Sequence, residues 1–179
     1  GYGINLVPLA TFAMETYKDD DCKEFLPKLS GGAAAMDEKT QRLTSQMHKA
    51  IAVIQFKLEC QLFKKHPEWK MKDRCLFDHI DYRKGKVEIY GKEYDMTSCH
   101  FPTIDPDNPD KLSEEEEFLI QKLHHSFMVC EKLHKHIKVM LQHGCMYAIF
   151  NNNLLFHASC PLNEDGSLKE VEIYPGKKF

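Results

Sequence analysis

The chain has 179 residues, a net charge of −3 and an ordinary share of hydrophobic residues, 42%. A chain of this length can bury the core of one domain of ordinary size. Nucleic-acid-binding proteins gain most of their affinity from lysine and arginine on phosphates, so the absence of a basic surplus argues against a nucleic-acid partner. No apolar run approaches the roughly 20 residues that a membrane-spanning helix needs, so no membrane is expected as a partner.

The seven cysteines are an odd number and are scattered along the chain without a C-x-x-C pair. A disulfide framework uses an even number of cysteines, and a structural zinc site uses closely spaced ones. The cysteine pattern therefore predicts reduced thiols in a cytoplasmic protein.

The first expected element is a helix over residues 6–17, an apolar stretch with Pro8 near its start. Residues 1–29 are assigned to this N-terminal helical segment. The small residues 30–35 (SGGAAA) could form a phosphate loop, but the G-x-x-x-x-G-K pattern is absent. The acidic Asp37 and Glu38 would also repel a phosphate at the following helix start. We expect a flexible linker over residues 30–35.

A long helix is expected from Asp37, which can cap it, to about Lys65, where His66 and Pro67 would end it. Its apolar residues recur at spacings of three and four. They form one continuous stripe, made of Leu43, Met47, Ala50, Ile51, Ile54, Leu58 and Leu62.

Two polar residues lie at the margin of this stripe, His48 and Lys49. They could contact a phosphorylated sugar, because lysine is a good point charge for phosphate. The alternative is that both are solvated residues on the flank of the helix.

The middle of the chain contains a small β unit and a loop. Residues 77–96 hold short alternating runs around glycines, which predict a hairpin or a small three-stranded meander. In residues 101–111 (FPTIDPDNPDK), Asp105, Asp107 and Asp110 could bind a cation. An EF-hand needs glycine at its sixth position, which Asp110 occupies here, so the prolines favour a rigid surface loop.

Ser113 and Glu116 have the spacing of a capping box, and the helix that they open is expected to run to Gly144, a C′ residue. Its expected apolar stripe consists of Ile120, Leu123, Phe127, Cys130, Leu133, Ile137 and Leu141. No two of its histidines stand at i and i+4, the spacing of zinc ligands on one helical face. The histidines are therefore interpreted as surface residues: His124, His125, His134, His136 and His143.

Two long helices with single apolar stripes must bury them on each other, on a sheet or on a second copy of the chain. The expected fold class is α+β, with two long amphipathic helices packed with a small β unit and a C-terminal β-hairpin. Loss of Ile54 or Phe127 should destabilise strongly, whereas truncation of Lys57 or Lys122 should be nearly neutral.

The C-terminal part holds the most informative stretch. Apolar residues 146–150 and 154–156 flank Asn151–Asn153, and asparagine tolerates the positive φ of a tight turn. The second run ends on His157, which is followed by small residues. Such a hairpin can place an imidazole at a strand edge, where ligands bind in layered folds. The alternative is a core histidine satisfied by a hydrogen bond. Residues 168–174 alternate and predict a last strand.

Residues 155–166 (LFHASCPLNEDG) resemble the H-G-C-x-P-L-N-E-D-G stretch of the bacterial class III fructose-1,6-bisphosphatases, which belong to the calcineurin-like metallophosphoesterases. The resemblance extends, in the family's order, to residues 2–20, 36–59, 101–109 and 125–137. Ala158 and Ser159 depart from the pattern, because the family more often has glycine and cysteine there.

The resemblance implies hydrolysis of the 1-phosphate of fructose 1,6-bisphosphate at a two-metal site, with manganese as the metal and the sugar bisphosphate as substrate. His157 matches a family histidine that ligates metal. The aspartate-histidine pair and the G-D-x-x-D-R-G and G-N-H-D/E turns of such phosphatases are absent. We therefore expect an internal fragment, inactive alone, with residues 36–144 as a helical insertion and residues 145–179 as part of the phosphoesterase core.

A hypothesis of a different class is also open. The segment could be a non-catalytic helical interaction or regulatory module, whose amphipathic helices form a subunit interface in a homo-oligomer or bind an effector.

Overall fold

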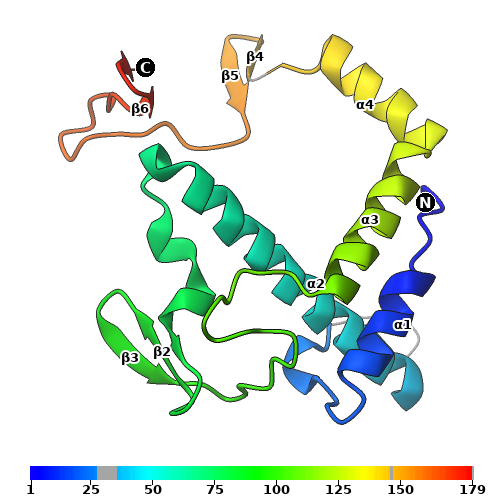
Figure 1. Cartoon of the computed structure of the whole chain (residues 1–179). Helices are drawn as coiled ribbons and strands as arrows, with labels where there is room; N and C mark the ends of the chain where they lie inside the picture. The colour runs from blue at the N-terminus through cyan, green and yellow to red at the C-terminus, as the bar shows by residue number, and fades with distance from the viewer. Residues whose placement is uncertain (28–35, 146, 179) are drawn as a thin grey trace. The chain divides into compact units, whose positions relative to one another are not determined.

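The computed structural model of the protein describes residues 1–27, 36–145 and 147–178 (Figure 1). The expected linker at residues 30–35 lies outside the described residues. The chain divides into two compact units. The first contains residues 3–128 together with Gly1, and the second contains residues 129–179 together with Tyr2. Helices and small antiparallel sheets make up the two units, so the α+β class is confirmed.

The first unit contains three α-helices, four 3₁₀-helices and a small sheet over its described residues. The helices are α1 (Val7–Thr16), η1 (Lys23–Phe25), α2 (Glu38–Lys65), η2 (Pro67–Trp69), η3 (Lys72–Arg74), η4 (Leu76–His79) and α3 (Glu114–Met128). The strands are β1 (Ile80–Asp81), β2 (Lys86–Ile89) and β3 (Lys92–Asp95).

Local signals set the ends of these helices as the sequence predicted. Pro8 lies in the first turn of α1. The Asp37 side chain accepts a hydrogen bond from the backbone N–H of Thr40 at 3.0 Å and so caps α2. Helix α2 ends at His66, just before Pro67, which begins η2.

The core of the first unit lies where α1, α2 and α3 meet (Figure 1). Its buried members come from all three helices and the loop after α1: Leu9, Phe12, Ala13, Tyr17, Cys22, Ala50, Ile54, Leu119 and Leu123. Ile54 is 1% exposed and belongs to the same buried core as Leu119 and Leu123, so the prediction that Ile54 is covered is confirmed. Helix α1 packs against both α2 and α3, so the two predicted helices bury their apolar residues largely on α1 rather than on each other.

The buried face of α2 is rotated from the predicted stripe. Its buried residues are Ser45, Gln46, Lys49, Ala50, Val53, Ile54, Lys57 and Cys60. Of the predicted stripe, Leu58 and Leu62 are 36% and 44% exposed. The hydrophobic pattern predicted the wrong face because four buried positions carry hydrogen-bonded polar side chains, Ser45, Gln46, Lys49 and Lys57. A hydrophobic period assumes that only apolar residues are buried.

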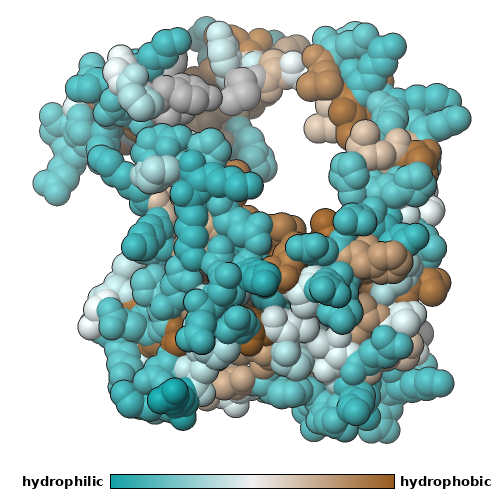
Figure 2. Space-filling view, viewed as in Figure 1, coloured by the Kyte–Doolittle hydropathy of each residue, from teal (hydrophilic) through white to brown (hydrophobic). Residues whose placement is uncertain are grey.

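The exposed part of the predicted stripe forms an apolar groove of about 380 Å³, lined by Ile51, Ile54, Gln55, Leu58, Glu59, Leu62 and Ile120. Figure 2 shows hydrophilic residues over much of the visible face of this unit, with hydrophobic ones gathered between α2 and α3.

Strands β1, β2 and β3 form the predicted three-stranded antiparallel meander, in that order. Tyr90 and Gly91 both have positive φ, +50° and +73°, in the two-residue turn between β2 and β3. These are the backbone angles of a type I′ turn, whose twist matches the flanking strands. The loop at residues 101–111 contains no helix or strand, as its prolines predicted.

The prediction of a single helix from Ser113 to Gly144 is wrong. The structure has two helices, α3 and α4 (Glu131–His143), and Cys130 between them is extended, with φ −82° and ψ 92°. Valine and cysteine are weak helix formers, and the apolar spacing of three and four continues across the break, which hid it. Phe127 is 46% exposed and α4 has no buried residue, so the predicted stripe is buried only at its start. Gly144 does end α4, but in an extended conformation with φ −71°.

The second unit contains α4 and two two-stranded sheets over its described residues. The strands are β4 (Tyr147–Phe150), β5 (Asn153–Phe156), β6 (Glu172–Tyr174) and β7 (Lys177–Lys178). The strand predicted at residues 168–174 is confirmed only over its last three residues, in β6, and Leu168 forms an isolated bridge with Leu162. No described helix of either unit is long and apolar enough to cross a membrane.

Candidate functional site

The predicted site residue, His157, directly follows the β4–β5 hairpin. Asn151 and Asn152 make the turn with φ of +50° and +61°, and Asn153 begins β5 opposite Phe150. Asparagine adopts this left-handed conformation more easily than most residues, which explains the run of asparagines. The hairpin and its turn are therefore confirmed, with the turn one residue shorter than predicted.

His157 is exposed, as are the apolar side chains of β5 before it. The alternative of a buried core histidine is wrong for this chain. Among the described residues, no group of three possible metal ligands includes His157. The histidine fits the role of a single imidazole ligand. The other ligands of the metal ion would have to come from other parts of the whole protein. Its assignment as a metal ligand stays a prediction.

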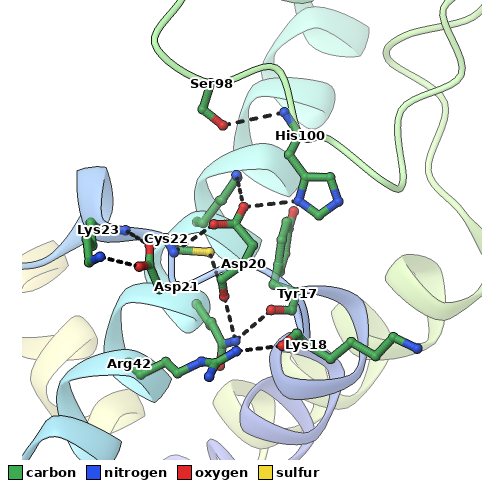
Figure 3. Close-up of polar contacts among 11 residues, drawn as sticks. Tyr17, Lys18, Asp20, Asp21, Cys22, Lys23, Arg42, Ser98 and His100 are labelled. Carbon is green, nitrogen blue, oxygen red and sulfur yellow. Dashed lines mark hydrogen bonds and ion pairs between the residues drawn. The ribbon is translucent and has the colours of Figure 1, made fainter.

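A charged cluster that the sequence did not predict is centred on Asp20, in the loop after α1 (Figure 3). The Asp20 carboxylate accepts hydrogen bonds from Lys49 Nζ at 2.7 Å and from the backbone N–H of Cys22 at 2.8 Å. His100 Nδ1 lies 3.1 Å from the same carboxylate. Burial alone would raise the pKa of Asp20, but these hydrogen bonds outweigh it and hold the pKa well below its usual range.

Lys49 is 1% exposed and lies among three aromatic rings. Its Nζ is 5.3 Å from the ring centre of Tyr17, 6.0 Å from Phe25 and 5.5 Å from Phe101. Neither alternative predicted for Lys49 describes it, because its charge is neither solvated nor free to bind a phosphate. His48 is exposed. The cluster holds the loop after α1 against α2, and its role is structural.

A second buried ion pair joins α2 to α3. Lys57 Nζ donates to Glu116 Oε2 at 2.8 Å and to the carbonyl oxygen of Thr103 at 2.6 Å, and neither charged side chain is exposed. The prediction that Lys57 is dispensable is therefore contradicted by its burial. Glu116 also accepts from the backbone N–H of Ser113 at 2.8 Å, and Ser113 Oγ accepts from the N–H of Glu116 at 3.2 Å. The predicted capping box is confirmed, and its glutamate serves both contacts.

One cluster of possible metal ligands stands out among the described residues: Cys60, Cys75 and Asp78, whose ligand atoms all lie within 4.8 Å of one another. Burial raises the pKa of the Cys60 thiol to about 12, and Cys75 and Asp78 act in the same direction. Sequence reasoning missed this cluster because 14 residues separate the two cysteines and no known zinc spacing applies. The only signal in the sequence was the short spacing between Cys75 and Asp78.

All seven cysteines are free, as the sequence predicted. The five histidines of α3 and α4 are exposed, so their interpretation as surface residues is also confirmed.

Comparison with known proteins places the chain in a family. The whole chain, residues 1–179, matches the family described as Firmicute fructose-1,6-bisphosphatase. It is 55% identical over 173 residues to a class 3 fructose-1,6-bisphosphatase of Parabacteroides distasonis, which covers 97% of this chain and 26% of the relative. The corresponding enzymes of Bacteroides thetaiotaomicron and Clostridium novyi are 51% and 50% identical, each over 100% of this chain and 27% of the relative. No solved structure matches.

The chain therefore belongs to the Firmicute fructose-1,6-bisphosphatase family, and the resemblance first noted around His157 is confirmed. It spans about a quarter of the length of the curated relatives that it matches.

Proposed function

We propose that this protein is a class 3 fructose-1,6-bisphosphatase, which hydrolyses fructose 1,6-bisphosphate to fructose 6-phosphate and phosphate, and that this chain forms one part of the enzyme. The observation that carries the proposal is the family match over all 179 residues, together with relatives of that name at 50–55% identity. The reduced thiols fit a cytoplasmic enzyme.

The proposed chemistry is that of a metallophosphoesterase with manganese. A pair of such ions, when bound, supplies a hydroxide nucleophile and stabilises the charge of the reacting phosphate. His157 would hold one ion through a ring nitrogen. Its position supports this role, because it directly follows the paired strand β5 and its imidazole is exposed.

The two buried lysines of the first unit are already paired with carboxylates. Lys49 binds Asp20 and Lys57 binds Glu116, and both lysines are buried. We therefore assign the first unit a supporting role and expect the contacts with the sugar bisphosphate to come mainly from outside it.

Phosphate release from fructose 1,6-bisphosphate, with added manganese, tests the proposal. The whole protein of which this chain is part should turn over at an ordinary enzymatic rate, about 1–1000 per second. The isolated 179-residue chain should release no phosphate, since one histidine cannot hold two metal ions. A folded whole protein without activity would refute the enzymatic proposal, and an active isolated chain would refute the division of roles.

A second candidate function is a non-catalytic interaction module, and the apolar groove beside α2 favours it. Occupation of this groove by a second copy of the chain would make a homo-oligomer. Replacing Leu58 and Leu62 by serine should then convert the oligomer to a monomer in analytical ultracentrifugation. A protein that is monomeric before the substitution would exclude this candidate.

A further inference from the structure

We propose that Cys60, Cys75 and Asp78 form a binding site for a zinc-type divalent cation, separate from the proposed manganese centre. The two sulfurs and a carboxylate oxygen lie within 4.8 Å of one another. Thiolates select zinc and similar borderline-soft cations over magnesium, calcium or manganese, which prefer oxygen ligands.

The backbone brings the three residues together from two segments. Cys60 lies on the buried face of α2, near the end of the helix. Cys75 precedes η4 and Asp78 is its third residue, and the backbone N–H of Asp78 donates to the carbonyl oxygen of Cys75 at 3.0 Å. Residues three apart eclipse one another on a 3₁₀-helix, so Cys75 and Asp78 face the same side, toward Cys60.

The side-chain geometry is close to that of a metal site. Cys60 Sγ lies 4.0 Å from Asp78 Oδ2, and Cys75 Sγ lies 3.8 Å from the carbonyl oxygen of Cys60. Zinc–sulfur bonds of ~2.3 Å place two thiolates of a tetrahedral site about 3.8 Å apart. From separations within 4.8 Å, the ligand atoms therefore need to move by about 1 Å or less.

The environment fits a site with three protein ligands and one open position. Cys60 and Cys75 are 2% and 1% exposed, whereas the Asp78 side chain is 26% exposed. Water can therefore reach the cation from the side of Asp78 and complete the tetrahedron. The bound ion would tie the end of α2 to the turn that leads into β1.

Lys64 is the group that competes with the cation. Its Nζ lies 3.1 Å from Asp78 Oδ2, but also 2.7 Å from Asp110 Oδ1. The Lys64 ammonium can therefore lose its ion pair with Asp78 and still keep its ion pair with Asp110. Removing Lys64 should strengthen cation binding, because Asp78 then has no competing positive charge.

Cobalt(II) titration of the reduced, metal-free protein tests the proposal. Cobalt bound to thiolates gives sulfur-to-metal charge-transfer absorption, which a manganese-type centre of oxygen and nitrogen ligands does not give. We expect this absorption to saturate at one Co²⁺ per chain and to disappear when Zn²⁺ displaces the cobalt. Absence of the band would overturn the proposal without affecting the proposed phosphatase activity.

Variants locate the site. Cys60→Ser, Cys75→Ser and Asp78→Asn should each weaken Co²⁺ binding by at least ~10–100-fold, the loss that even an outer-shell change can cause. Asp78→Asn replaces a partly exposed side chain, so it remains informative if a buried cysteine variant fails to fold. Lys64→Ala should bind Co²⁺ more tightly, and weaker binding would contradict the role of Asp78.

Two controls complete the test. Cys22→Ser removes another buried thiol of the first unit and should leave the band unchanged. Replacing the exposed Cys145 and Cys160 by serine should also leave it unchanged. If the band is lost in this double variant and kept in Cys60→Ser and Cys75→Ser, the cation binds surface thiols and the proposed site is wrong.

Discussion

Lys57 is the buried cation through which α2 and α3 are joined, and its replacement should be costly. Lys57→Ala would leave the Glu116 carboxylate buried without its partner, which typically costs about 3–5 kcal/mol. Chemical denaturation of the protein measures this loss as a lower free energy of unfolding. Lys122→Ala, which removes an exposed lysine of α3, is the matched control and should change the free energy of unfolding by less than about 0.5 kcal/mol.

The double variant Lys57→Met with Glu116→Gln tests whether the loss of stability in Lys57→Ala comes from the unpaired buried charge of Glu116. It removes both charges and keeps the glutamine oxygen available to the backbone N–H of Ser113, so it should lose less stability than Lys57→Ala alone. A double variant that is less stable than the single one would contradict this account of the ion pair.

Asp20 should make the free energy of unfolding depend on pH in the acidic range. Its pKa in the folded protein lies below the unfolded value of about 3.9, so its contribution is present above that pH and is lost as the pH falls through the folded pKa. The free energy of unfolding should therefore fall more steeply below about pH 4 in the parent protein than in Asp20→Asn. Urea unfolding at a series of pH values measures both slopes, and equal slopes would contradict the role of Asp20.

At the scale of single elements, α2 presents one buried and one exposed aliphatic face. Ile54 is 1% exposed and Leu62 is 44% exposed, although both belong to the predicted stripe. Ile54→Ala should cost about 2–5 kcal/mol, whereas Leu62→Ala should cost less than about 1 kcal/mol. Thermal or urea unfolding of the two variants compares them directly. Similar losses would mean that Leu62 is covered and that the groove is occupied.

The helix ends and turns were predictable because their signals are local. Asp37, Pro67 and the Ser113–Glu116 box each act within a few residues of the end that they define. The buried face of α2 was not predictable, because Lys49 and Lys57 are buried only through partners distant in the sequence. Asp20 and Glu116 are 29 and 59 residues away from them. A hydrophobic pattern contains no information about such pairs.

The break between α3 and α4 escaped prediction for a related reason. The apolar spacing is uninterrupted from Ile120 to Leu141, and neither glycine nor proline marks Val129 and Cys130. Weak helix formers end a helix only where packing no longer supports it. The last buried residue of α3 is Leu123, so that support stops before the break.

At the scale of the whole molecule, the family could be recognised from the sequence, but the site could be recognised only in part. His157 was identified by resemblance, and the structure adds that it is exposed at the end of a two-stranded hairpin. The Cys60–Cys75–Asp78 cluster could not be identified from spacing, since it depends on how η4 packs against α2.

The most direct test of the central claim is the activity of His157→Ala in the whole protein, with His136→Ala on α4 as a matched exposed-histidine control. If His157 holds a metal ion of a fructose-1,6-bisphosphatase, the variant should lose at least ~10–100-fold of its manganese-dependent phosphate release. Its melting temperature should stay near that of the parent protein, because the histidine is exposed. Full activity in His157→Ala, or an equal loss in His136→Ala, would contradict the assignment.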